Sequence, residues 1–507
     1  MKGSNGFAIA LGLSLSKSVA AVYTNSTSSC CNAIAQALSN NVYSPSTSAY
    51  NVSINTRWSG TSVLEPACVI IPQSAEDVSA AIKLITQNQC KFSVKSGGHN
   101  ANPGANSISG GVSIDLSGFK STSLSADRSF VSLGSGVTWG EAYDAFNSSN
   151  IGFTGGICED VGVGGVSLGG GQSLFAPKRG WAVDNILNYE IVLASGDIVN
   201  ANETSNADLF KALKGGNTNF GIVTRVDLDA FDFDGLWGGE VYVNLTGTEA
   251  ARSDVLDQIS HAITNFTTNN HLDTSSAVQL MTVYLSGGRG QIVNAAFGNT
   301  DGVEKPESIQ PFLEMPNQVL NEAGPVKIAD FVHKVSQFQA KGYREVTASV
   351  TFNNDYNTIR DIWDATDAVY DALSSKDKVD WMVSFIPQAQ IQQTYAAKRG
   401  GNSLGLTDVP DQIVVWLTSR WTDPSLDEMM EGARQQFVDE SVAVAQKYDT
   451  YYPFLYINYA APFQNPLCGY GDESVEFLKT AASKYDPNGV FQTLMPGGFK
   501  VGNLTCS

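Results

Sequence analysis

The chain has 507 residues, of which 42% are hydrophobic and 16% charged, a composition typical of a folded globular protein with more than one domain. Its 50 acidic and 31 basic residues give a net charge of −19. Nucleic acids and anionic membranes attract clustered lysine and arginine, so this charge argues against both as partners. Beyond the N-terminus, no apolar stretch approaches the ~20 residues that span a bilayer. We expect a monomer that acts on a small molecule.

The N-terminus has the features of a secretory signal peptide. Lys2 is followed by an apolar stretch from Phe7 to Leu15 and by small residues at Ser18 to Ala20, which predicts a signal peptide over residues 1–20, with a short buried helix as the alternative. Sequons of the form N-x-S/T occur at Asn25, Asn51, Asn147, Asn202, Asn244, Asn265 and Asn503. Both features indicate a protein that is secreted or resides in the secretory lumen.

The chain contains seven cysteines and four histidines. In an oxidising compartment an odd number of cysteines leaves one thiol without a disulfide partner. No paired C-x-x-C pattern is present, so no metal site is expected.

In chain order, short apolar runs alternate with amphipathic stretches up to about residue 232, which predicts an α+β fold. The predicted strands are 68–71, 92–94, 112–116, 131–133, 186–193 and 222–228, and the predicted helices are 75–87, 139–147 and 208–214. We place a first domain at residues 60–232. Longer helices such as 426–448, between strands such as 413–418, indicate a second domain at 233–449, and the aromatic-rich remainder, 450–507, is expected to return to the first.

The segment Lys95-Ser96-Gly97-Gly98-His99-Asn100 directly follows a predicted strand. Glycines at such a position let the backbone approach a diphosphate closely and point N–H groups at it. The segment has neither the P-loop spacing nor the G-x-G-x-x-G of a Rossmann turn. His99 alone could equally be an ordinary loop histidine.

In a second glycine-rich segment, Thr154 to Gly171, eight of eighteen residues are glycine. Ordering a glycine costs ~0.5–1 kcal/mol more than ordering an alanine, so this density indicates a flat ligand against the backbone. Cys158 lies within the segment, where it could be a nucleophile, a covalent cofactor anchor or half of a disulfide.

The order and spacing of these motifs resemble the berberine-bridge-enzyme-like branch of the vanillyl-alcohol-oxidase flavoproteins, in its fungal secreted form. The resemblance covers residues 30 to the end and rests on KSGGH, on Cys158 fifty-nine residues after His99, on GGNTNFGIVT and on DPNGVFQTLMPGGF. It implies a two-lobed fold: a PCMH-type FAD-binding domain, and a substrate domain with an antiparallel sheet backed by helices.

The resemblance also implies that FAD is bound covalently, through His99 at the flavin 8α-methyl group and Cys158 at flavin C6. The other implied FAD contacts are Ser96, Gly97, Gly98, Asn100, Ser135, Gly136, Val161, Gly162, Gly165 and Val223. With Cys158 bound to flavin, six cysteines remain for three disulfides. A Cys468–Cys506 bond would tie down the C-terminal tail, and the family suggests Cys30 or Cys31 with Cys90.

Two further positions bear on the oxidant and on the flavin geometry. Val161 is similar to the residue found in family members that use dioxygen, which favours an oxidase. Val166 stands where the family often has histidine, a departure from its pattern near the flavin.

The catalytic base is the least defined element. In the plant alkaloid enzymes of the family a glutamate serves, and the corresponding position here is Trp416. The related sugar and polyketide oxidases use a tyrosine of Y-x-N-Y, which makes Tyr459, then Tyr456, the candidates, although such a phenol needs its pKa of ~10 lowered. Cleft-wall candidates are Gln388, Trp416 and Arg420, whereas His261, His271 and His333 are expected to be surface or capping residues.

The family implies an FAD-dependent oxidase. Such an enzyme would transfer hydride from an alcohol or ring C–H of a small natural-product intermediate to flavin N5, and dioxygen would reoxidise the flavin to give hydrogen peroxide. The alternatives are an oligosaccharide oxidase, a flavin-dependent cyclase without net oxidation, and a non-catalytic secreted protein.

Overall fold

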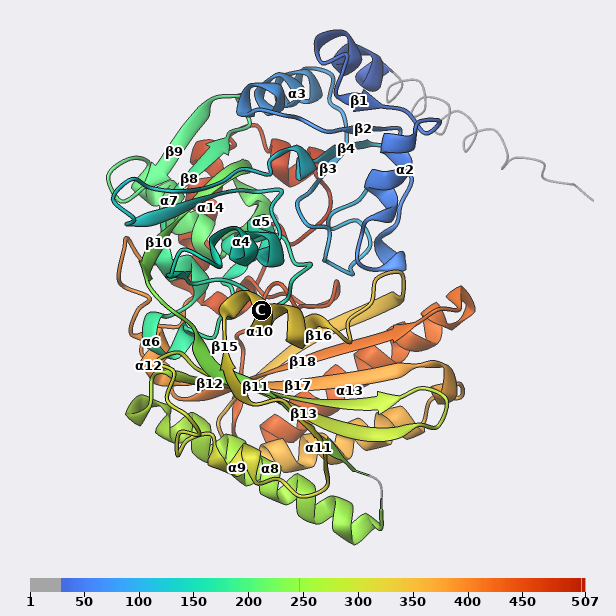
Figure 1. The fold of residues 1–507 in the computed structure, drawn as a ribbon. Coiled ribbons are helices and arrows are strands. Elements are labelled where there is room, and N and C mark those ends of the chain that lie inside the picture. Colours follow the sequence, from blue (N-terminus) through green and yellow to red (C-terminus); the bar gives the residue numbers. More distant parts are fainter. Residues whose placement is uncertain (1–28, 246, 503, 507) are drawn as a thin grey trace, which may run out of the picture.

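The computed structural model describes residues 29–245, 247–502 and 504–506, so the predicted signal peptide at 1–20 lies outside the described residues, as do the sequons at Asn25 and Asn503. Figure 1 shows two lobes, an upper one built mainly from the N-terminal half and a lower one built around a single large sheet. Among the described residues, no helix combines the length and the apolar character needed to cross a membrane.

The first sheet of the upper lobe has the order β1-β2-β4-β3, in which β2, β4 and β3 are parallel and β1 is an antiparallel edge strand. Its strands are β1 (Val42–Tyr43), β2 (Cys68–Ile70), β3 (Phe92–Lys95) and β4 (Val112–Asp115). Helix α2 (Ser48–Asn55) precedes β2, and α3 (Ala75–Gln87) connects β2 to β3. The hydroxyl of Ser74 caps α3 by accepting from the Asp77 N–H. The strand, helix and strand predicted here are confirmed.

The second sheet of the upper lobe is antiparallel, with the order β5-β6-β10-β8-β9 and β7 paired to β10. Its strands are β5 (Thr122–Leu124), β6 (Phe130–Gly134), β7 (Ile151–Phe153), β8 (Ile186–Val192), β9 (Ile198–Asn202) and β10 (Ile222–Asp232). The helices in this part are α4 (Trp139–Phe146), α5 (Val163–Gly169), α6 (Ala176–Arg179) and α7 (Ala207–Gly216). The short helix α5 lies against β10 and α7, which places the second glycine-rich segment between the lobe's sheets.

The lower lobe is one antiparallel sheet with the order β14-β11-β13-β12-β17-β18-β16-β19 and β15 paired to β11. Its strands are β11 (Leu236–Asn244), β12 (Ser276–Leu285), β13 (Gly290–Asn299), β14 (Gln318–Asn321), β15 (Gly324–Val326), β16 (Arg344–Asn353), β17 (Asp380–Gln388), β18 (Gln412–Trp421) and β19 (Tyr451–Tyr452). The helices of this part are α8 (Glu249–Asn269), α9 (Gln310–Leu313), α10 (Ile328–Ser336), α11 (Tyr356–Asp371), α12 (Gln390–Gln393) and α13 (Asp427–Lys447). Figure 1 shows α8, α11 and α13 beneath the sheet and α10 between the lobes.

The alternation of side chains in β16 sets the two faces of this sheet. Val346, Ala348 and Val350 are buried in the core shared with α8, α11 and α13, so Thr347 and Ser349 point to the opposite face, because successive strand residues alternate. That opposite face meets the upper lobe. The predicted antiparallel sheet backed by helices is confirmed.

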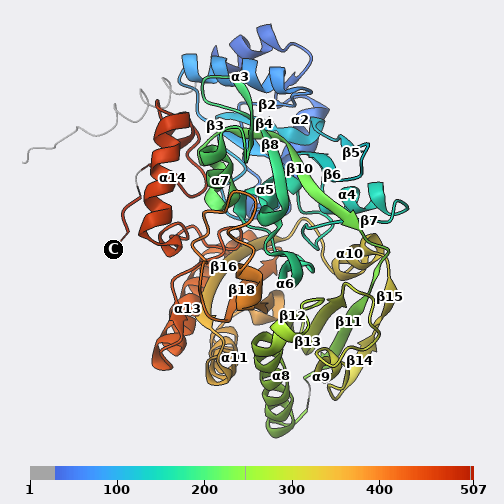
Figure 2. The ribbon, with the colours of Figure 1, turned by 90° about the vertical axis from the view of Figure 1, so that its left-hand side faces the viewer.

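The C-terminal segment returns to the upper lobe, where Figure 2 shows α14 (Asp472–Tyr485) beside α7. Lys484 and Tyr485 both bond to the carboxylate of Asp208 on α7. Strand β19 pairs with β16. The domain boundaries at 232 and 449 stay predictions.

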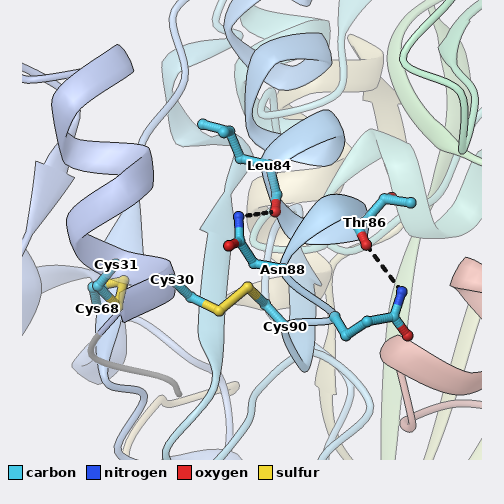
Figure 3. Close-up of a disulfide and its surroundings, with 8 residues drawn as sticks. Cys30, Cys31, Cys68, Leu84, Thr86, Asn88 and Cys90 are labelled. Atoms are coloured by element: carbon cyan, nitrogen blue, oxygen red, sulfur yellow. Dashed lines mark hydrogen bonds between the residues drawn. A yellow bond between two sulfur atoms is a disulfide. The ribbon is translucent and has the colours of Figure 1, made fainter. Parts of the chain in front are cut away.

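Three disulfides fix the ends of the chain, and all seven cysteines are among the described residues. Cys30–Cys90 and Cys31–Cys68 tie the helix at residues 29–37 to the first sheet, beside the end of α3 (Figure 3). Cys468–Cys506 closes the C-terminal tail. The Cys468–Cys506 bond expected for the tail and the Cys30–Cys90 pairing suggested by the family are confirmed.

A buried ion pair holds the end of β3 against β4. Asp115 is 1% exposed and accepts from Lys95 Nζ at 3.0 Å, from Ser53 Oγ at 2.5 Å and from the Ser117 N–H at 3.0 Å. Because Lys95 directly precedes Ser96, this pair fixes the start of the first glycine-bearing loop.

Asp115→Asn should lower the free energy of unfolding by ~3–5 kcal/mol, because it leaves the buried Lys95 ammonium without its counter-charge. Urea denaturation measures the effect. The exposed pair Lys376–Asp371 supplies the control, since Asp371→Asn should cost no more than ~1 kcal/mol. Equal midpoints for the two variants would contradict this role of Asp115.

Candidate functional site

The loop that follows β3 is held by hydrogen bonds to neighbouring segments. Ser96 Oγ donates to the Ser135 carbonyl at 2.5 Å, and Asn100 Oδ1 accepts from the Asn102 N–H at 2.9 Å. Gly98 adopts a φ of +72°, in the left-handed region of backbone conformation that residues other than glycine rarely adopt.

The two glycine-rich segments meet backbone to backbone. A Cβ on Gly97 would lie 2.4 Å from the Gly162 nitrogen, and a Cβ on Gly162 would lie 2.3 Å from the Gly97 nitrogen. A Cβ on Gly136 would lie 2.0 Å from the Leu116 carbonyl oxygen. These glycines therefore permit an approach that any side chain would block.

This approach brings His99 and Cys158 together, with Cys158 Sγ 3.9 Å from His99 Nε2. Cys158 is outside every disulfide of the chain. Burial lowers the pKa of His99 to about 4, although the charge of Asp160 opposes this, so the imidazole is neutral near pH 7 and keeps a lone pair. Burial raises the pKa of the Cys158 thiol to about 12, so this cysteine is not a thiolate nucleophile by itself.

Residues at the end of α10 and after it cover the Cys158 segment. Gln339 Oε1 lies 2.9 Å from Cys158 Sγ, Ser336 Oγ accepts from the Glu159 N–H at 3.0 Å, and Lys341 pairs with Asp160 at 2.5 Å. Contacts from the lower lobe therefore cover the thiol and help to fix the position of the Cys158 segment.

His333 bridges the two lobes at the surface. Its ring nitrogens lie 2.5 Å from Glu159 Oε2 and 3.0 Å from Asp144 Oδ1, and these bonds raise the pKa of His333. His333 is exposed, as predicted, and α10 places it between two carboxylates of the upper lobe. His261, stacked on Tyr356, and His271, bonded to the Thr268 carbonyl, are exposed.

The other expected cofactor contacts fall into two groups. Ser135 Oγ is buried without a hydrogen-bond partner, and a Cβ on Gly165 would meet no protein atom within 4 Å, so both are available to a bound group. Val161 is half-buried beside Cys158, where its N–H bonds to the Cys158 carbonyl at 3.3 Å. Val223, by contrast, is 4% exposed and packs in the core of the upper lobe.

The two candidate tyrosines differ in what their hydroxyls contact. Tyr456 OH accepts from the Gly171 N–H at 3.0 Å and from Asn458 Nδ2 at 3.1 Å. The Tyr459 ring stacks on Trp416, with centroids 4.5 Å apart, and among the described residues its hydroxyl has no hydrogen-bond partner. Burial, together with Tyr456 and Cys158, raises the pKa of Tyr459 well above its ordinary value.

The three predicted cleft-wall residues differ in burial and in their hydrogen-bond partners. Trp416 is half-buried and donates from Nε1 to Thr347 Oγ1 at 2.9 Å. Arg420 donates to Asp380 at 2.9 Å and to the Phe338 carbonyl at 3.3 Å. Gln388 is 1% exposed and bonds to Gln172, so it belongs to the packed interface between the lobes.

Backbone pairing aligns side chains in rows across the sheet face that meets the upper lobe. One row consists of Ile292, Val283, Met382, Thr418 and Thr347. The next row consists of Asn294, Met281, Ser384, Trp416 and Ser349. The half-buried members are mainly apolar: Ile292, Val283, Met281, Met382 and Trp416. This face therefore offers an apolar surface beside Tyr459.

Sequence reasoning missed Trp58, which contacts His99, and Glu345, which bonds to Trp58. The Trp58 ring stacks on the His99 ring, with centroids 4.2 Å apart, and Trp58 Nε1 donates to Glu345 Oε2 at 2.6 Å. The available signal was a glutamate at the start of the alternating strand REVTASVTF. Within residues 29–245, 247–502 and 504–506, no group of three His, Cys, Asp or Glu residues could hold a metal ion.

Comparisons with known proteins agree with this geometry. Residues 66–202 match the family described as FAD binding domain. The FAD-dependent monooxygenase drtC of Aspergillus calidoustus is 31% identical over 94% of this chain and 90% of that protein. In fold, the chain is similar to glucooligosaccharide oxidase of Acremonium strictum, which carries a 6-S-cysteinyl, 8α-N1-histidyl FAD, with a TM-score of 0.76, 19% identity and coverage of 92% and 98% of the two chains. A second solved structure is 6-hydroxy-D-nicotine oxidase of Arthrobacter nicotinovorans, with a TM-score of 0.75, 20% identity and coverage of 89% and 96%.

Gly97→Ala should lower the free energy of unfolding by about 3 kcal/mol or more, because the new methyl group would overlap backbone atoms of Gly162 that cannot move aside. Urea denaturation of the purified protein measures this. Gly432→Ala on α13 is the control: a Cβ there meets no atom within 4 Å, and alanine should stabilise the helix by ~0.5–1 kcal/mol. Equal stability of the Gly97 variant and the parent protein would refute the close contact.

Proposed function

The chain belongs to the vanillyl-alcohol-oxidase family of FAD-linked oxidoreductases, in its berberine-bridge-enzyme-like branch, and from this membership we propose an oxidase that binds FAD covalently through both His99 and Cys158. The observation that carries the proposal is the 3.9 Å approach of His99 Nε2 to Cys158 Sγ. It is supported by the neutral imidazole and by a thiol that takes part in no disulfide.

The donor set fits this cofactor. The 8α-methyl group and C6 belong to the same ring of the flavin, so side chains that bond to both must lie close to each other. Ser135 Oγ is buried and unpartnered, and one side of Gly165 is open, so both would accommodate the rest of the molecule. We propose as its other contacts Ser96, Gly97, Gly98, Asn100, Gly136, Val161, Gly162 and Val223.

Each covalent bond replaces one hydrogen of the chain and one of the flavin. His99 loses its N–H proton and Cys158 its S–H proton, while the 8α-methyl group and C6 each lose one hydrogen. The two electrons released per bond pass to dioxygen, which becomes hydrogen peroxide.

When bound, FAD supplies a hydride acceptor and passes the electrons to dioxygen. The chain must supply the group that takes the substrate proton, and we assign this to Tyr459. Burial raises the pKa of this phenol, so the bound flavin would have to lower it for the phenol to act as the base. The Tyr459 hydroxyl has no hydrogen-bond partner among the described residues, whereas the Tyr456 hydroxyl accepts hydrogen bonds from Gly171 and Asn458. Tyr456 is therefore assigned a structural role beside the site. Val161, next to Cys158, favours dioxygen as the oxidant.

The substrate that we favour is an alcohol or ring C–H of a small, largely apolar natural-product intermediate. The half-buried positions of the sheet face beside Tyr459 are mainly Ile, Val, Met and Trp. Such side chains stabilise apolar ring systems, whereas an oligosaccharide needs polar groups to replace the water on its hydroxyls.

An oligosaccharide oxidase is the second candidate, because the stacked pair Trp416 and Tyr459 could also receive a sugar ring. A flavin-dependent cyclase would use the same cofactor without net oxidation. If substrate added in the absence of dioxygen left the flavin absorbance unchanged, that result would favour a cyclase. The three disulfides support our proposal that the protein is secreted.

The covalent attachment is tested with His99→Ala, Cys158→Ala and the double variant. After acid denaturation, each single variant should retain yellow flavin through its remaining anchor, and the double variant should release all of it. Absorbance of the washed precipitate measures the bound flavin. Flavin that stays attached to the double variant would falsify the assignment of both anchors.

Tyr459→Phe should slow anaerobic bleaching of the flavin by ~10²–10⁴-fold, the contribution of a general base. Because burial raises the pKa of Tyr459, the deprotonated fraction grows with pH throughout the neutral range. The rate in the parent protein should therefore rise with pH, and the variant should lose this slope. Stopped-flow absorbance measures both effects.

The exposed Tyr451 provides the control, since Tyr451→Phe should keep the parent rate and slope. An unchanged rate and slope in Tyr459→Phe would exclude Tyr459 as the base.

A further inference from the structure

Trp58 holds one face of the His99 ring. The two rings are nearly parallel, at an angle of 19° and a centroid distance of 4.2 Å. The backbone N–H of Trp58 also donates to the Gly98 carbonyl at 3.0 Å. Trp58 is 6% exposed, so its indole cannot move away from the histidine without disturbing the surrounding core.

Glu345 fixes this indole from the lower lobe. Its Oε2 accepts from Trp58 Nε1 at 2.6 Å. The glutamate backbone is itself fixed, because its N–H donates to Ser59 Oγ at 2.8 Å and its carbonyl accepts from Thr61 Oγ1 at 3.2 Å. The start of β16 is thereby attached to the segment that carries Trp58.

Burying the carboxyl group of Glu345 costs free energy, because the group loses its hydration. Glu345 is 7% exposed, and burial raises its pKa to about 7, with the hydrogen bond from Trp58 and the charge of Arg420 opposing the rise. An apolar side chain would avoid this desolvation but would leave the buried indole N–H without an acceptor. The feature that Glu345 provides is a defined orientation of the Trp58 ring.

We propose that Glu345 and Trp58 are positioning residues for His99: Glu345 sets the plane of the indole, and the indole sets the plane of the imidazole that bonds to FAD. This inference rests on the proposed attachment at His99. Glu345 bonds to the edge of the indole at Nε1, so it acts on His99 through Trp58. Its effect is to reduce the rotation of the histidine ring before the bond forms.

The test uses Cys158→Ala as the parent, so that His99 is the remaining anchor. Into it are introduced Glu345→Leu, which removes the acceptor, Glu345→Gln, whose amide oxygen can still accept from the indole, and Trp58→Phe, which removes the donor. The matched control is Glu240→Leu. Glu240 is a second buried carboxyl of the same sheet, 3% exposed and bonded to Asn294.

The measurement is the rate at which protein produced in a riboflavin-deficient host, and therefore purified without flavin, becomes covalently labelled with added FAD, followed by flavin fluorescence in denaturing gels. Glu345→Leu and Trp58→Phe should each slow labelling about tenfold, equal to ~1.4 kcal/mol and thus on the scale of one hydrogen bond. Glu345→Gln and Glu240→Leu should label at the parent rate. Circular dichroism checks that each variant is folded.

Labelling of both Glu345→Leu and Trp58→Phe at the parent rate would overturn the inference and leave the attachment at His99 intact. Equal slowing in Glu345→Gln and Glu345→Leu would also overturn it, because charge rather than orientation would then matter. If the Cys158→Ala parent itself never becomes labelled, the proposed attachment at His99 fails, and the inference fails with it.

Discussion

The close contact between the backbones of Gly97 and Gly162 is the constraint on which the rest of the site depends. A Cβ on either glycine would lie within 2.4 Å of a backbone atom of the other, so this arrangement exists only because both residues lack one. From this contact follow the positions of His99 and Cys158, whose Nε2 and Sγ lie 3.9 Å apart. The buried pair Lys95–Asp115 holds one side of the contact in place.

The lower lobe completes the site in two ways. One face of its sheet provides apolar side chains beside Tyr459, and the segment from the end of α10 to the start of β16 reaches the two anchors. In that segment Gln339 lies against Cys158, and Glu345 bonds to Trp58, which stacks on His99. The two lobes thus hold the pair from opposite sides, and each anchor depends on residues that are distant in sequence.

Local patterns in the sequence were enough to predict most elements of the upper lobe. The helix predicted at 75–87 coincides with α3, because a serine cap, acidic residues in the first turn and an apolar face all favour the same helix. The pairing of His99 with Cys158 came from the family resemblance, and the structure brings the two side chains together. Their assignment as flavin anchors stays a prediction.

The contacts between the lobes could not be predicted in this way. Trp58 and Glu345 are far apart in sequence, and neither belongs to a local motif, so their hydrogen bond depends on how β16 docks against the upper lobe. For the same reason the sequence does not reveal the partners of His333, which is exposed as predicted, or those of Gln388, a predicted cleft-wall residue. Both positions are decided by partners from the other lobe: Glu159 and Asp144 for His333, and Gln172 for Gln388.

Mass spectrometry of a tryptic digest tests the central claim most directly. Cleavage after Lys95 and Lys120 releases His99 in one peptide, and cleavage after Arg128 and Lys178 releases Cys158 in another. Bicovalent attachment predicts one species that contains both peptides joined through a single flavin. Two separate peptides, both free of flavin mass, would contradict it.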